Sequence, residues 1–165
     1  MMNESRFDVN DAAVRNEFLR HQALAAMAGL NERTHPRWGR MAPQQMVEHL
    51  IWAFELSIGK AETVCMNPES DLPRVKSFLY SNRPTRRGVR IPALASGLPP
   101  LRYASLDEAK AVLGQELQCF LEDAPRAGRL YTHPVFGPIG HEEWHRAHYK
   151  HTHHHLLQFG LIGPL

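Results

Sequence analysis

An all-α fold, a four-helix bundle with a long crossover between its second and third helices, is predicted by three features of the sequence. Four segments carry apolar residues at helical spacing, no segment shows the strict alternation of a half-buried strand, and a proline-rich stretch separates the second helical segment from the third. The chain of 165 residues has the length of one ordinary domain. We therefore expect residues 1–165 to form a single helical domain.

The first two predicted helices have recognisable ends. The first spans residues 10–29, with Asn10 as its N-cap and Gly29 as its stop. The second spans residues 43–58 and begins at a proline, a residue that suits the first turn of a helix, and Gly59 follows its last turn. Both segments place apolar side chains three or four positions apart, so each is expected to bury one face.

Residues 60–104 form the predicted crossover. Six prolines exclude continuous regular structure in it: Pro68, Pro73, Pro84, Pro92, Pro99 and Pro100. Residues 71–80 are expected to form a short helix within it. A connection this long suits a bundle in which one link passes over the body of the fold.

The last two helices complete the predicted bundle. The third spans residues 105–122, where Ser105 and Glu108 match a capping box ahead of an apolar run. Residues 131–140, rich in proline and glycine and without a hairpin signal, are expected to form a loop. The fourth helix follows over residues 141–159.

Composition and charge exclude several classes of function. The formal net charge of +2 argues against a nucleic-acid partner or an anionic membrane. The two cysteines, Cys65 and Cys119, are too few for a disulfide framework, and residues 1–10 lack the pattern of a secretion signal. The most apolar helical segment, residues 46–58, falls short of the ~20 residues that cross a bilayer. A cytoplasmic location is the expectation.

The fourth helix carries an unusual density of histidines. Seven of the eleven histidines in the chain lie within residues 141–155. Helical spacing places five residues in one stripe: Trp144, His148, His151, His155 and Gln158. His151 and His155 stand at positions i and i+4, about 5 to 6 Å apart at Cβ, so both rings can turn toward one metal ion.

His49 is the candidate third ligand. It is the only histidine of the apolar second helix, and a histidine facing an i, i+4 pair is one way in which helical bundles build metal sites. Three protein ligands leave one coordination position for water or substrate, as catalytic sites do. A lone histidine in an apolar helix more often makes an ordinary hydrogen bond, and an H-x-x-x-H pair alone is weak, so the prediction depends on the three together.

Several nearby residues compete with or support these ligands. His148 shares the stripe and His153 lies on the same helix, so either of them could replace one of the proposed ligands. Gln158, one turn beyond His155, and Trp144 are candidates for supporting the site from outside the ligand set. Glu48, next to the histidine of the second helix, is a candidate general base, although we expect its side chain to be solvated.

Three segments together resemble the DinB-like (DinB/YfiT) superfamily of proposed metalloenzymes, and within it a bacterial branch of unknown function. The segments are residues 37–50 (RWGRMAPQQMVEHL), 133–137 (HPVFG) and, after Trp144, 151–160 (HTHHHLLQFG). The resemblance covers most of the chain, and these three segments are diagnostic whereas the crossover is not. It implies a four-helix bundle with a long link between the second and third helices, and three ligands that map onto His49, His151 and His155.

The resemblance also implies possible activities. Some members of the superfamily are thiol S-transferases or thiol-dependent isomerases in which a metal favours a low-molecular-weight thiolate, and a homodimer is compatible with the family. We therefore expect an enzyme that uses one divalent transition metal, zinc or nickel, on a small-molecule substrate, in thiol transfer or hydrolysis. The alternative is a non-catalytic ligand-binding or interaction protein whose metal is structural or absent.

Four arginines cluster in the crossover, where they are candidates for binding an anion. They are Arg83, Arg86, Arg87 and Arg90. Guanidinium groups bind phosphate and carboxylate in a bidentate manner, so this cluster could hold an anionic substrate. Solvated loop charge is the simpler interpretation.

Overall fold

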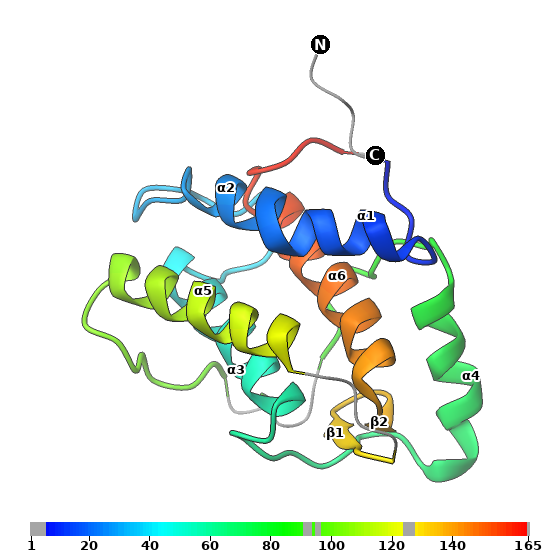
Figure 1. Cartoon of the computed structure of the whole chain (residues 1–165). Coiled ribbons are helices and arrows are strands. Elements are labelled where there is room, and N and C mark those ends of the chain that lie inside the picture. The colour runs from blue at the N-terminus through cyan, green and yellow to red at the C-terminus, as the bar shows by residue number, and fades with distance from the viewer. Residues whose placement is uncertain (1–5, 91–93, 95–96, 124–127, 165) are drawn as a thin grey trace.

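The computed structural model describes residues 6–90, 94, 97–123 and 128–164, and their fold is mainly helical (Figure 1). The first helix runs through α1 (Ala12–Glu17), a π-helical turn (Phe18–Gln22) and α2 (Ala23–Met27). Asp11 caps it, because its carboxylate accepts hydrogen bonds from main-chain N–H groups of the first turn. The helix was expected at this place, but the predicted cap, Asn10, lies one residue too early.

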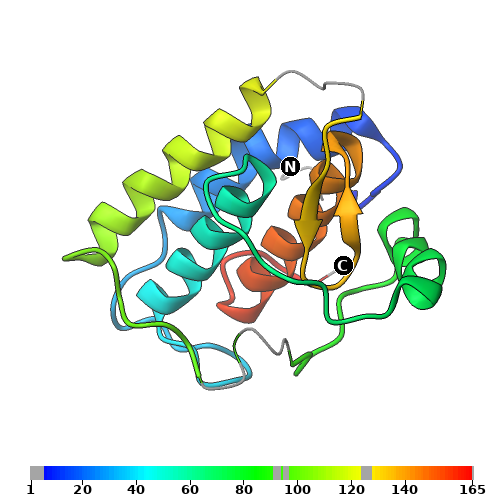
Figure 2. The same ribbon diagram turned by 90° about the horizontal axis from the view of Figure 1, so that it is seen from below.

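Helices α3 (Pro43–Ser57) and α5 (Leu106–Glu122) lie side by side in both views (Figures 1 and 2). Their bounds agree with the predicted ranges, 43–58 and 105–122, to within one residue. The hydroxyl of Ser105 accepts a hydrogen bond from the main-chain N–H of Glu108, so the predicted N-cap of α5 is also confirmed. Helix α3 is buried along most of its length, which fits its apolar composition.

Helix α6 (His141–Gln158) lies between the α3–α5 pair and the short helix α4 (Leu72–Lys76) (Figure 1). It packs against α1, α2 and α3, so apolar residues from both ends of the chain share one core. Trp144 and Tyr149 of α6 are among the largest fully buried side chains. Within the described residues, no helix combines the length and the apolar character that a membrane span requires.

The crossover is tied to α6 through Lys150. The crossover contains α4 (Leu72–Lys76), which is flanked by 3-10 turns. This agrees with the short helix expected over residues 71–80. The ammonium group of Lys150 donates hydrogen bonds to the main-chain oxygens of Phe78, Ser81 and Arg83. These bonds use all three donors of the ammonium group and hold the crossover against the outer side of α6.

The segment before α6 corrects the all-α prediction. Strands β1 (Tyr131–His133) and β2 (Gly137–Ile139) form an antiparallel hairpin where a loop without strands was expected (Figure 2). Strands of three residues are too short to show the alternation by which a strand is recognised in a sequence. The ring nitrogen Nδ1 of His133 accepts the main-chain N–H of Val135 and closes the turn. The fold is therefore helical with one small sheet.

Candidate metal centre

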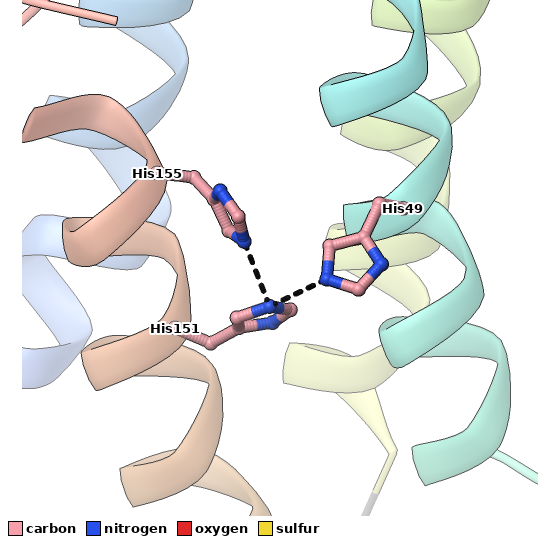
Figure 3. A group of neighbouring side chains, drawn as sticks. All are labelled: His49, His151 and His155. Atoms are coloured by element: carbon pink, nitrogen blue, oxygen red, sulfur yellow. Dashed lines mark hydrogen bonds between the residues drawn. The ribbon is translucent and has the colours of Figure 1, made fainter. Parts of the chain in front are cut away.

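Three histidine rings from two helices converge between α3 and α6 (Figure 3). The Nε2 atom of His151 lies 3.0 Å from Nε2 of His49 and 3.1 Å from Nε2 of His155. One nitrogen from each ring lies within 4.8 Å of the others. These are the three histidines that the sequence predicts as ligands, and the structure brings them together.

The geometry of the cluster suits a metal ion. Ligand nitrogens at 2.0–2.1 Å from a tetrahedral ion lie about 3.3 Å from one another, close to the distances of 3.0 and 3.1 Å from Nε2 of His151 to the other two rings. Among the residues that the structure describes, the group contains three side chains with metal-ligating atoms, one fewer than a structural zinc site requires. The cluster can therefore hold one ion and leave a coordination position for another molecule.

Hydrogen bonding alone does not satisfy the three nitrogens. A neutral imidazole nitrogen carries either one proton or one lone pair, yet Nε2 of His151 faces two other ring nitrogens. At most one of these two contacts can be a good hydrogen bond. A cation at the centre would accept all three lone pairs at once.

Burial keeps the cluster neutral. It lowers the pKa of His49 to about 4. Burial, and then the neighbouring imidazoles, lower the pKa of His151 well below its usual value, and burial and His49 do the same for His155. Neutral rings are the form in which histidine binds a metal, so the environment favours ligation over protonation.

Gln158 sets the orientation of His155. The amide Nε2 of Gln158 donates to the main-chain oxygen of Trp38 at 3.0 Å, and its Oε1 lies 2.7 Å from Nδ1 of His155. Because a carbonyl oxygen can only accept, the amide nitrogen must face Trp38 and the amide oxygen must face the ring. Nδ1 of His155 therefore carries the proton, and its Nε2 offers a lone pair to the centre of the cluster.

The two competing histidines lie outside the cluster. His148 is fully buried, stacks on Phe54 with ring centroids 3.9 Å apart, and has its Nε2 2.8 Å from the hydroxyl of Ser57. Because that hydroxyl donates to the oxygen of Phe54, Nε2 of His148 is the donor in the second bond. His153 points away from the cluster and packs on Phe7. Neither ring belongs to the group of three.

Trp144 and Glu48, the other two residues predicted to support the site, form hydrogen bonds to other parts of the fold. The indole N–H of Trp144 donates to the oxygen of Tyr131 and holds the hairpin against α6. Glu48 was expected to be solvated, and that expectation is wrong, because the residue is only 9% exposed. One of its carboxylate oxygens accepts the main-chain N–H of Arg102 at 2.6 Å and the other accepts the amide of Gln44 at 3.0 Å. These bonds direct the carboxylate toward the end of the crossover.

Sequence reasoning missed the part that Trp38 plays in the site. The main-chain oxygen of Trp38 holds the glutamine that orients His155. Every residue carries a main-chain oxygen, so no side-chain pattern could have identified it. The signal in the sequence was the glycine that follows Trp38: Gly39 has a φ of +78°, which favours glycine, and it lies close to Gln158.

Searches of protein-family models, of curated proteins and of solved structures found no match to the chain. The resemblance to the DinB-like superfamily therefore stays a prediction from the sequence motifs. The candidate metal centre is supported by the geometry of its own residues.

Proposed function

We propose that the chain is a metal-dependent enzyme in which His49, His151 and His155 hold one divalent transition ion. The observation that carries the proposal is the convergence of three Nε2 atoms from two helices. Imidazole ligands suit zinc and nickel, and a set of three protein ligands is typical of catalytic rather than structural zinc sites. The DinB-like type of bundle, inferred from the sequence motifs, belongs to the same proposal.

The residues of the chain would prepare the site for chemistry. When bound, the ion would act as a Lewis acid on a thiol, a water molecule or a carbonyl group. Burial keeps the three imidazoles unprotonated, and the amide of Gln158 directs the lone pair of His155 inward. Thiol transfer with a low-molecular-weight thiol, or hydrolysis of a small-molecule substrate, is the reaction class that we propose, with a homodimer as the assembly.

Metal stoichiometry tests the ligand set. Protein purified without an affinity tag should carry about one transition ion per chain by elemental analysis, and His49→Ala should lose most of it because two ligands hold an ion far less tightly than three. His35→Ala, which changes an exposed histidine of the connector, is the matched control and should retain the ion. Equal occupancy in His49→Ala and the unmodified chain would refute the ligand assignment.

A separate measurement tests the reaction class. Metal-loaded protein should consume an electrophile in the presence of a low-molecular-weight thiol, or hydrolyse an activated ester, faster than His49→Ala does. Absence of thiol transfer with hydrolysis retained would remove the transferase version. Absence of both reactions, with stoichiometric metal, would leave the metal site standing and favour the non-catalytic alternative.

A further inference from the structure

A second site lies on the other side of α6 from the metal ligands. It is a pocket of about 220 Å³, called here the Trp38 pocket, and it is lined by Phe7, Trp38, Pro84, Thr85, Arg87, Lys150, His153, His154 and Leu157. None of the three proposed metal ligands lines it. The pocket and the cluster are nevertheless neighbours, because the ring of His154 lies 5.1 Å from that of His155.

Arg87 contributes a cation to the pocket. Its guanidinium carbon lies 3.9 Å from the ring centroid of Trp38, so the planar group is stacked on the indole. Arg87 is exposed and, among the residues that the structure describes, makes no side-chain hydrogen bond or salt bridge, so its N–H donors are open to a ligand. Lys150 donates its three N–H groups to main-chain oxygens of the crossover. It therefore makes the electrostatic potential of the pocket more positive but has no donor left for a ligand.

The charge and polarity of the lining favour an anion. None of the lining residues is acidic. His153 is only 8% exposed, and within the described part of the chain its ring nitrogens have no hydrogen-bond partner. The imidazole of His153, at the wall of a pocket that also holds the guanidinium of Arg87, is suited to a ligand that carries hydrogen-bond acceptors.

The remaining lining sets the size and shape of the ligand. Phe7, Pro84 and Leu157 offer apolar surface, and the edge of Phe7 packs against His153 with ring centroids 4.7 Å apart. An apolar cavity of about 150 Å³ is known to hold benzene. A pocket of about 220 Å³ therefore has room for one ring and a small polar group.

We propose that the Trp38 pocket binds a small organic carboxylate with a flat apolar body the size of one aromatic ring. The carboxylate pairs with the guanidinium of Arg87, and the ring lies against Leu157 and Phe7. This inference does not depend on the proposed function, since none of the metal ligands contributes to the pocket. The bound ligand would sit against Trp38, whose main-chain oxygen holds Gln158 behind the metal centre.

Calorimetric titration of the metal-free full chain tests the proposal, with benzoate as the probe. Benzoate should bind saturably, and benzyl alcohol, its neutral analogue, should bind at least about tenfold more weakly because it cannot form the charge-assisted pair. Arg87→Met should weaken benzoate binding by about tenfold or more. Arg86→Met is the matched control, since Arg86 is exposed and does not line the pocket, and it should bind benzoate as the unmodified chain does.

Four results would overturn the proposal. They are the absence of saturable benzoate binding, equal binding by Arg87→Met, inorganic phosphate binding as tightly as benzoate, and a requirement for added zinc. If phosphate binds as tightly as benzoate, the apolar wall of the pocket contributes nothing to the binding affinity. If benzoate binds only when zinc is added and His49→Ala abolishes that binding, the carboxylate binds the metal instead of the pocket. The metal-site proposal would then remain intact.

Discussion

At the residue scale, the tautomer of the candidate ligand His155 is set by the main-chain oxygen of Trp38, which acts through Gln158. The oxygen of Trp38 fixes the amide of Gln158, and the amide fixes the proton of His155 on Nδ1. Such outer hydrogen bonds hold the ring orientation and make the ligand nitrogen more basic. The tautomer in which His155 can bind a metal therefore depends on a glutamine that is not one of the three candidate ligands.

Gln158→Leu is expected to weaken metal affinity by about 10- to 100-fold, the range found when outer partners of ligating histidines are removed. The leucine keeps the volume of the side chain but cannot accept the Nδ1–H of His155, so the ring loses its fixed orientation. Competition with a chromophoric chelator measures the change.

Gln118→Leu makes the same substitution on the exposed side of α5 and should bind metal like the unmodified chain. If both glutamine variants bind metal equally well, Gln158 does not orient His155, and the position of the proton on that ring must be set in another way.

At the scale of elements, the connector between α2 and α3 brings Trp38 to the end of α6. The main-chain N–H of Arg37 donates to the oxygen of Gln158 at 2.7 Å, and Gly39 turns the chain with φ of +78°. A Cβ atom at position 39 would lie 2.9 Å from the side-chain nitrogen of Gln158. Glycine is therefore needed here both for the backbone angle and for the close approach.

Gly39→Ala is expected to lower the free energy of unfolding by about 1–2 kcal/mol through its backbone angle and to weaken metal affinity as well. The added methyl group pushes the amide of Gln158 away from the oxygen of Trp38, so the effect should reach His155. Urea unfolding and chelator competition measure the two effects separately.

Gly88→Ala separates the strain of the backbone from the contact. Gly88 has nearly the same angle, φ of +72°, but a Cβ there would have open space around it. This variant should lose similar stability and keep its metal affinity. A Gly39→Ala protein that binds metal as tightly as Gly88→Ala would show that the approach to Gln158 has no influence on the site.

At the scale of the whole molecule, the interior holds many histidines in the neutral state. Burial lowers the pKa of His133 to about 3 and that of His145 to about 4, and it lowers the pKa of His148 well below its usual value. His145 has a second cause, the guanidinium of Arg15, whose Nε donates to its Nδ1 at 2.8 Å. In the unfolded chain these rings take up protons at their usual pKa of about 6.5, which couples stability to pH.

The sign of this coupling gives a prediction. Because the folded pKa of His145 lies below the unfolded one, the unfolded chain binds more protons between about pH 6.5 and 4, and stability falls as the pH drops through that window. His145→Gln keeps an acceptor for Arg15 but takes up no proton. It should therefore reduce the pH slope of the unfolding free energy by up to about 1.4 kcal/mol per pH unit there.

Urea unfolding of the metal-free protein at several pH values measures this slope, with a chelator present so that metal binding does not contribute. His35→Gln, which changes an exposed histidine, serves as the matched control. A slope in His145→Gln as steep as in the control would mean that His145 is protonated equally in the folded and unfolded chains.

The sequence predicted those features that depend on neighbours along the chain. Helical spacing located α3, α5 and α6 within a residue or two, and it paired His151 with His155, because positions i and i+4 are adjacent in any α-helix. The proline-rich crossover with its short helix was also predictable. The prediction of His49 required a further assumption, that an isolated histidine in an apolar helix faces His151 and His155.

Only the tertiary structure decided which parts of separate helices meet. Spacing placed His148 in the same stripe as His151, yet packing buries it against Phe54, and Glu48 turned out to be buried against the crossover. The hairpin and the bond between Gln158 and Trp38 were equally hidden. Periodicity constrains residues within a few turns of one another, whereas distances between helices follow from how their side chains fill a shared core.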